Sequence, residues 1–124
     1  MKVSMLKKHD PKQEYYFEEG CYITEISNST DDEDVSIARA RVEEGQQTKW
    51  HYLKNTTERY VIVQGEGSAE IGDGEPLRVS LGDVVVIPAD TRQRIKNTGK
   101  GDLVFLAVCS PRFHTKNYHE ISQE

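Results

Sequence analysis

The amino-acid sequence predicts an all-β protein of about eight to nine strands, arranged as a sandwich, a barrel or a jelly roll. Short segments rich in β-branched and aromatic residues follow one another, with turn-forming residues about every 6 to 12 positions. No segment shows the sustained 3.6-residue apolar repeat of an amphipathic helix. The length of 124 residues suits one domain with a single core.

The strand-like segments can be placed in order along the chain. They are residues 21–27, 35–42, 48–53, 58–65, 68–74, 76–80, 83–89, 92–99 and 102–110. The segment 68–74 ends in Gly72-Asp73-Gly74, which has the turn chemistry of a hairpin. Residues 1–18 form a predicted N-terminal arm or strand, and the tail 110–124 is predicted as one helical turn or an arm.

Composition and charge limit the classes of partner. The formal charge of −5 argues against nucleic acid or an anionic membrane, because both attract clustered Lys and Arg. The longest apolar run, Leu103 to Cys109, is far shorter than the roughly 20 residues that cross a bilayer. The basic start of the chain lacks the apolar stretch of a secretory signal, and Cys21 and Cys109 make no disulfide framework. We therefore expect a cytoplasmic protein with reduced, buried cysteines.

Several strands are apolar on both faces. In 58–65, Glu58, Tyr60 and Ile62 lie on one side, and the other side carries Val61 and Val63. One apolar face can line the barrel, whereas the second needs another sheet or another subunit. We therefore expect a homodimer joined sheet to sheet.

His51 and Glu58 are predicted to meet inside the barrel. The four residues 54–57 between them suit a turn, so the chain can fold back and point both side chains inward, together with Leu53, Tyr60 and Ile62. An imidazole and a carboxylate in an apolar cavity must be paired, hydrated or bound to metal, because burying them bare is costly.

The spacing around this pair resembles the first motif of the cupin superfamily, glycine-x5-His-x-His-x4-Glu-x6-glycine. Gly45, His51, Glu58 and Gly65 occupy the matching positions, and Leu53 replaces the second histidine. Residues 82–97 resemble the second motif, glycine-x5-Pro-x-Gly-x2-His-x3-Asn.

In that second motif Gly82, Pro88 and Asn97 match, Asp90 stands for the glycine and Gln93 for the histidine. Aspartate tolerates the left-handed backbone conformation better than most residues, so Asp90 should cost the fold little.

The resemblance implies a single cupin jelly-roll domain with its core at about 35–109. It also implies a metal site, for which His51, Glu58 and Gln93 remain as donors. Cupins similar to phosphomannose isomerases do place a glutamine among their zinc ligands. Zinc, nickel, iron and manganese are all compatible with this mixed set, to which His114 or His119 can add a donor. The alternative is a hydrogen-bonded polar cluster that recognises a ligand without metal.

Residues beside the motifs have two interpretations each. Arg39 and Arg41 alternate with alanines, and they either clamp an anionic ligand inside the barrel or lie on an exposed or interface face, paired with acids. Tyr60 either donates a hydrogen bond to a ligand or fills the barrel.

Residues that alternate with the motif side chains should point away from the cavity. Arg92 and Arg94 flank Gln93 and are expected outside. Trp50, next to His51, is expected to pack outside the barrel, at the subunit contact.

The resemblance implies a protein that binds a small polar or anionic molecule in the barrel interior. As an enzyme it would be an isomerase, an epimerase or a decarboxylase, with Glu58 as a metal ligand or, without metal, as the general base. The alternative is a non-catalytic ligand-binding or sensory module that has lost full metal ligation, which Leu53 and Gln93 favour. A third hypothesis, a purely structural barrel, predicts a filled interior.

Overall fold

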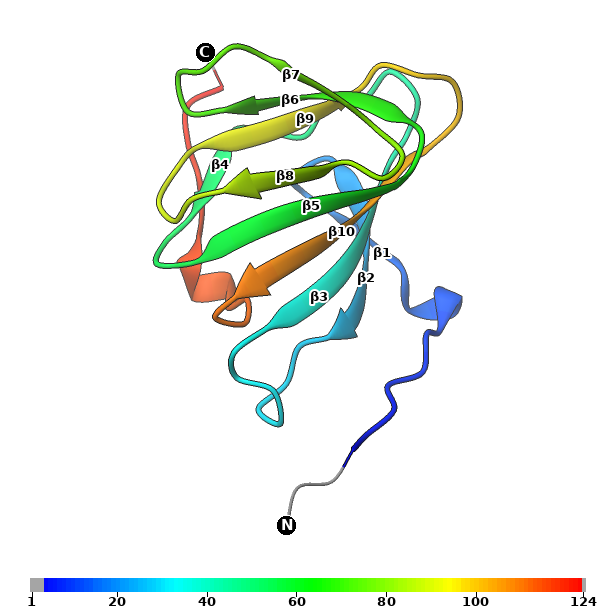
Figure 1. Cartoon of the computed structure of the whole chain (residues 1–124), viewed down its shortest axis with the longest axis vertical. Coiled ribbons are helices and arrows are strands. Elements are labelled where there is room, and N and C mark those ends of the chain that lie inside the picture. The colour runs from blue at the N-terminus through cyan, green and yellow to red at the C-terminus, as the bar shows by residue number, and fades with distance from the viewer. Residues whose placement is uncertain (1–3, 124) are drawn as a thin grey trace.

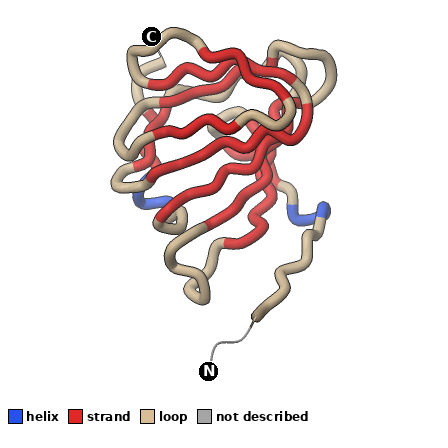
Figure 2. The backbone as a smooth tube through the Cα atoms, viewed as in Figure 1, coloured by secondary structure: helices blue, strands red, loops and turns tan. Residues whose placement is uncertain are grey.

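The computed structural model describes residues 4–123, which form two antiparallel sheets that wrap into a jelly roll (Figures 1 and 2). The six-stranded sheet has the order β1 (Tyr15–Phe17), β2 (Cys21–Ser27), β3 (Ser36–Val42), β10 (Leu103–Ser110), β5 (Thr57–Gln64) and β8 (Val84–Ile87). The five-stranded sheet has the order β11 (Tyr118–Glu120), β4 (His51–Leu53), β9 (Gln93–Asn97), β6 (Glu66–Ile71) and β7 (Leu77–Ser80). The predicted all-β jelly-roll class is confirmed.

The described chain contains a strand in every predicted strand segment, the strand β1 within the predicted N-terminal arm or strand, and one more strand, β11, in the tail. β1 pairs with β2, and β11 pairs with β4 with Tyr118 opposite Leu53. The tail was expected as one helical turn or an arm; it has a 3-10 turn at Thr115–Asn117 and then continues as β11. Another 3-10 turn, Pro11–Gln13, precedes β1. No helix within residues 4–123 has the length and apolar character needed to span a membrane.

The core lies between the two sheets. Its buried apolar residues come from both, for example Ile62 and Phe105 from the six-stranded sheet and Ala69, Val79 and Ile95 from the other. The predicted hairpin between β6 and β7 is present, and the Gly74 amide donates to the Ile71 carbonyl across its turn at 3.1 Å. The alternation of buried and exposed residues along these strands is what one buried face per sheet requires.

The motif turns have the backbone conformations expected of them. Asp90 has φ of 64°, in the left-handed region, and its carboxylate accepts from the Asn55 amide at 2.9 Å. The Asp90 amide donates to the Leu53 carbonyl at 3.0 Å. The aspartate that replaces the motif glycine therefore fastens the turn between β4 and β5. At Gly65, with φ of 85°, a Cβ would lie only 2.7 Å from the Asp102 carbonyl oxygen, so glycine is required there.

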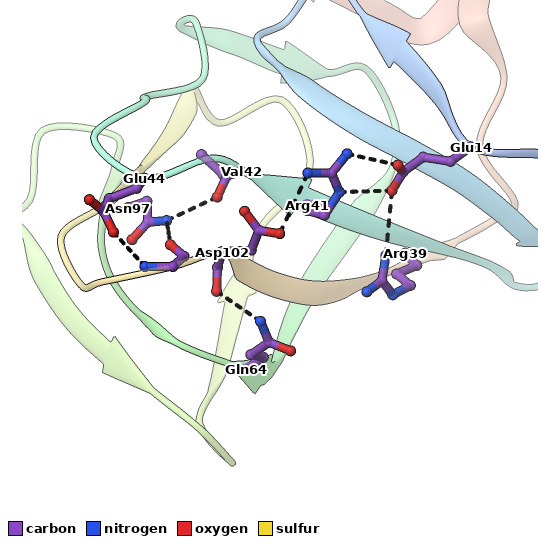
Figure 3. Close-up of polar contacts among 9 residues, drawn as sticks. Glu14, Arg39, Arg41, Val42, Glu44, Gln64, Asn97 and Asp102 are labelled. Carbon is purple, nitrogen blue, oxygen red and sulfur yellow. Dashed lines mark hydrogen bonds and ion pairs between the residues drawn. The ribbon is translucent and has the colours of Figure 1, made fainter. Parts of the chain in front are cut away.

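Arg39 and Arg41 lie on the outer face of β3, and neither lines the cavity. Figure 3 shows both side chains directed at the Glu14 carboxylate. Arg41 binds the Glu14 carboxylate with Nη2 at 2.8 Å and Nε at 3.0 Å, and its guanidinium stacks over the Tyr22 ring. Arg39 reaches the same carboxylate at 3.5 Å. The hydrogen bonds from Arg41 lower the pKa of Glu14. The assignment of both arginines to ligand binding in the cavity is therefore corrected: they hold the N-terminal segment against β3.

Trp50 is covered by its own chain and not by a subunit contact. The guanidinium carbons of Arg92 and Arg94 each lie 4.2 Å from the centre of its ring, and only 3% of the residue is exposed. Arg94 also pairs with Glu70, and Arg92 with Asp73. The three alternating side chains expected outside the barrel thus pack on one another there.

Candidate functional site

The barrel interior contains a cavity of about 320 Å³. Small side chains leave this space open: Ser36, Ala38 and Ala40 on β3 and Ala107 on β10 all face it. Ala38 is paired with Ala107 across the two strands, and Ala107 is paired with Tyr60 of β5. The alanines that alternate with Arg39 and Arg41 therefore mark the inner face, and the interior is not filled as a purely structural barrel would require.

His51, on β4, is held by contacts to both ring nitrogens. Nδ1 lies 2.7 Å from the Lys49 carbonyl oxygen, to which it donates, and Nε2 lies 3.1 Å from Glu19 Oε1. The ring also stacks on Tyr118 with 5.2 Å between centroids. Nδ1 uses one N–H to donate to the carbonyl. Nε2 and the Glu19 carboxylate can therefore form a hydrogen bond only if a second proton lies between them.

Glu58, on β5, is a buried carboxylate with one free oxygen. The residue is only 8% exposed; Oε2 accepts from the Cys109 thiol at 3.7 Å, and Oε1 has no hydrogen-bond partner among the described residues. Burial raises the pKa of Glu58 to about 7, although His51 nearby opposes the shift. Near neutral pH the group is therefore poised to take up or release a proton.

Tyr60 and Gln93 form a buried pair that joins the two sheets. The Tyr60 hydroxyl donates to Gln93 Oε1, and both side chains are almost fully buried. Burial, and after it the charge of Glu58, raises the pKa of the Tyr60 phenol well above its ordinary value. The Gln93 side chain also favours the charged form of Glu58 and so opposes the rise of its pKa. The Gln93 oxygen is thus already engaged within the wall of the barrel.

The structure brings four of the predicted interior residues to the cavity: His51, Leu53, Glu58 and Tyr60 line it. Gln93 lies behind Tyr60 and does not line it, and Ile62 belongs to the apolar core. Of the tail histidines, His114 lines the cavity. His119 instead stacks on Tyr52, with 5.0 Å between centroids.

Glu19 is the site residue that sequence reasoning missed. It lies in the turn between β1 and β2, with Oε1 at His51 and Oε2 3.6 Å from the Cys21 thiol. Its neighbour Glu18 is exposed, and no motif distinguishes the two glutamates. Only the pairing of β1 with β2, which starts with Phe17 opposite Cys21, sets which one points inward.

The residues at the motif positions do not fit the metal centre that the motifs imply. Leu53 has no donor atom, the Gln93 oxygen accepts from Tyr60, and His51 Nε2 faces Glu19. Within residues 4–123 no three or more His, Cys, Asp or Glu side chains are grouped so as to hold a metal ion. The free oxygen of Glu58 is a single donor and does not make a site alone.

A jelly-roll barrel whose interior cavity is lined by buried His51 and Glu58 defines the class of this protein. The Cupin domain family model matches residues 38–109, which is more than half of the chain, so the chain belongs to the cupin family. An uncharacterized protein of Methanocaldococcus jannaschii, MJ1618, is 30% identical over 108 residues, with 86% of each chain covered. A second uncharacterized protein of that organism, MJ0764, is 26% identical over 97 residues, which are 78% of this chain and 83% of the relative.

Solved structures share the fold. KdgF from Halomonas superposes with a TM-score of 0.73 at 22% identity, covering 87% of this chain and 91% of its own. Pac13 from Streptomyces, a nucleoside dehydratase, has a TM-score of 0.77 at 17% identity and covers 96% and 93%. A predicted oxalate decarboxylase from Thermotoga maritima has a TM-score of 0.66 at 26% identity and covers 73% and 80%.

Proposed function

We propose that this cupin binds a small polar molecule in its cavity and moves a proton with Glu58, as an isomerase or epimerase would, without a resident metal. The observation that carries the proposal is the buried carboxylate on the cavity wall, with a free oxygen and a pKa of about 7. A nucleoside dehydratase shares the fold over 96% of this chain, which supports an enzymatic role.

The proposed step is an ordinary acid–base exchange. Ionised Glu58 takes a proton from a carbon next to a carbonyl, and the electron pair of that C–H bond moves into an enolate. The proton returns to carbon from Glu58, or from the His51–Glu19 pair on the neighbouring β4 strand and β1–β2 turn. The Cys109 thiol stabilises the charged form of Glu58 through its contact with Oε2. A decarboxylase reaction is disfavoured, because the substrate carboxylate would meet Glu19, Glu25 and Glu58.

Proton exchange with solvent tests this function. Small ketones and aldehydes with neutral, cationic or anionic substituents would be incubated with the protein in D₂O and followed by ¹H NMR. We expect deuterium at the carbon next to the carbonyl, with a rate that rises with pH around 7 as Glu58 ionises. Glu58→Gln should lower that rate by about 100-fold or more, since a positioned base contributes 10² to 10⁴.

Glu18→Gln is the matched control, because Glu18 is exposed and should leave the rate unchanged. Metal analysis of the wild type and of His51→Ala tests the proposal that the site holds no resident metal. A stoichiometric ion in the wild type that is lost in His51→Ala would contradict that proposal. Exchange that survives Glu58→Gln would reject the role of Glu58. Binding without exchange would favour the alternative function, a non-catalytic ligand-binding or sensory module, which the replacement of a metal-binding histidine by Leu53 supports.

We also propose the homodimer, with the outer face of β5 and β8 as its interface. Val84 and Val86 on the edge strand β8 are 56% and 61% exposed, and Val63 on β5 is 40% exposed. Val84 pairs with Val61, so these side chains lie on one face, which a second copy can cover around a two-fold axis. We keep the cytoplasm as the expected location.

Light scattering tests the oligomeric state. We expect a mass of twice the 14.2 kDa chain, and about half of it for the double variant Val84→Lys/Val86→Lys. Leu77→Lys is the control, because Leu77 is 48% exposed on β7 of the other sheet. A wild-type monomer, or a dimer that the double lysine variant leaves intact, would contradict this interface.

A further inference from the structure

Acidic side chains outnumber basic ones around the cavity. Glu19, Glu25 and Glu58 line it, and the basic side chains among its twenty lining residues are His51 and His114. No Lys or Arg of residues 4–123 lines it. Glu58 is buried, its Oε1 has no partner among the described residues, and burial raises its pKa, so a ligand that favours its charged form is what this carboxylate lacks. Glu25 lines the cavity from an exposed position on β2.

Arg39, Arg41 and Arg112 are paired with acidic residues that do not line the cavity. Arg39 and Arg41 lie on the outer face with Glu14. Arg112 lies 3.4 Å from Glu33 and donates to Asn28 at 3.0 Å, and Asn28 is the residue of this pair that lines the cavity. Arg39 and Arg41 point away from the cavity, and Arg112 pairs with Glu33, so an anionic ligand, expected as an option from the sequence, would enter without a guanidinium to bind it.

Aromatic rings supply much of the remaining wall. Six of the twenty lining residues are aromatic: Tyr15, Phe17, Tyr60, Phe105, Phe113 and Tyr118. Phe17 and Tyr118 meet edge to face at 5.2 Å, so they form one continuous aromatic surface from β1 to β11. Aromatic walls attract organic cations through the negative face of each ring, and most strongly where water is excluded.

We propose that the cavity selects a small organic cation, a quaternary or protonated amine, through Glu25, Glu58 and its aromatic wall. This proposal rests on the proposed function in one respect only: both take the cavity as the binding site. Glu25 and Glu58, for which no ion pair forms among the described residues, supply the counter-charge, and the rings hold the alkyl groups on the nitrogen. The ammonium group orients the molecule, whereas the chemistry at Glu58 concerns a neighbouring carbon atom.

Three probes of the same shape and different charge test the selection. Choline carries the cation; 3,3-dimethylbutan-1-ol has carbon in place of its nitrogen; and 3,3-dimethylbutanoate is an anion of similar bulk. Calorimetric titration of the wild type at pH 8 should give choline an affinity about ten-fold or more above both others. Neither choline nor its isostere has a carbonyl, so the result does not depend on proton transfer.

Protein variants locate the selectivity. Glu25→Gln and Glu58→Gln should each reduce the preference for choline over its neutral isostere several-fold, while Glu18→Gln leaves it unchanged. Equal affinity for the three probes, tighter binding of the anion, or no binding of any probe at millimolar concentration would overturn the proposal, even if deuterium exchange occurs. Because the three-probe comparison uses the wild type, it remains decisive where a variant fails to fold.

The pH dependence of choline binding gives an independent reading. The titratable groups around Glu58 come from several elements: Glu19 from the β1–β2 turn, Cys21 from β2, His51 from β4, Tyr60 from β5 and Cys109 from β10. A bound cation favours ionised Glu58, so choline affinity should rise from pH 6 to pH 8 and binding should release a proton. An affinity that falls over this range would reject a cation site at Glu58.

Discussion

The Glu58→Gln variant should gain stability relative to the wild type as the pH rises. The pKa of Glu58 is raised from 4.5 to about 7 by burial, so the folded chain holds this proton where the unfolded chain has lost it. Below pH 4.5 both states are protonated and the group has no effect. Between pH 4.5 and 7 the wild-type free energy of unfolding should fall by about 3 kcal/mol, at 1.36 kcal/mol for each pKa unit, and then level off.

Urea denaturation of wild type and Glu58→Gln from pH 4 to pH 8 measures this difference. Other groups titrate in both proteins, so the free energy of the variant minus that of the wild type isolates Glu58 and should climb across the interval. Glu18→Gln, the exposed neighbour of Glu19, should give a flat difference. A flat curve for Glu58→Gln, or one that falls as the pH rises, would mean that Glu58 is charged in the folded protein and is stabilised by His51.

Stability and function are coupled at this residue. A carboxylate buried without a partner for Oε1 destabilises the free protein at neutral pH. Such a cost is typical of functional sites, where the ligand supplies the contact that the free protein lacks. A bound cation should therefore remove part of the penalty. The same group that weakens the free protein is then the one that recognises and acts on the ligand.

The sequence was sufficient for the fold and for half of the site. Strand alternation and motif spacing predicted that His51, Leu53, Glu58 and Tyr60 would share one interior, because a period of two and one turn fix their direction. Asp90 in a left-handed conformation also followed from residue chemistry. These features depend on neighbours within a few positions along the chain.

The remaining features depend on contacts between distant segments. Gln93 has the predicted direction, but a hydrogen bond from Tyr60 on the opposite sheet takes its oxygen. Alternation along β3 does not say whether the alanines or the arginines face the interior. The partner that holds Arg41 on the outer face, Glu14, comes from a distant part of the chain. Glu19 enters through a turn that no motif marks. Spacing cannot encode such pairings, and they decide whether this cavity holds a metal or an organic molecule.

A larger side chain on one strand of the cavity wall should weaken ligand binding strongly without unfolding the protein. Ala38 faces the open volume from β3, so Ala38→Leu places three more carbon atoms into existing space and avoids the overpacking cost of a filled core. We expect the affinity for choline to fall by about 30-fold or more, because the added carbon atoms occupy part of the cavity of about 320 Å³ and compete with the ligand for it. The melting temperature should stay equal or rise.

Ala107→Leu on β10 should behave in the same way, since Ala107 is the residue paired with Ala38 across the two strands. Ser68→Leu is the control: it adds similar bulk on β6, outside the lining of the cavity, and should leave choline binding unchanged. Two substitutions on different strands that act alike, beside one that does not, would assign binding to the interior and not to the exposed valines of β8. Undiminished choline binding by both leucine variants would place the ligand elsewhere on the barrel, and the roles given to Glu58 and the aromatic wall would fall with it.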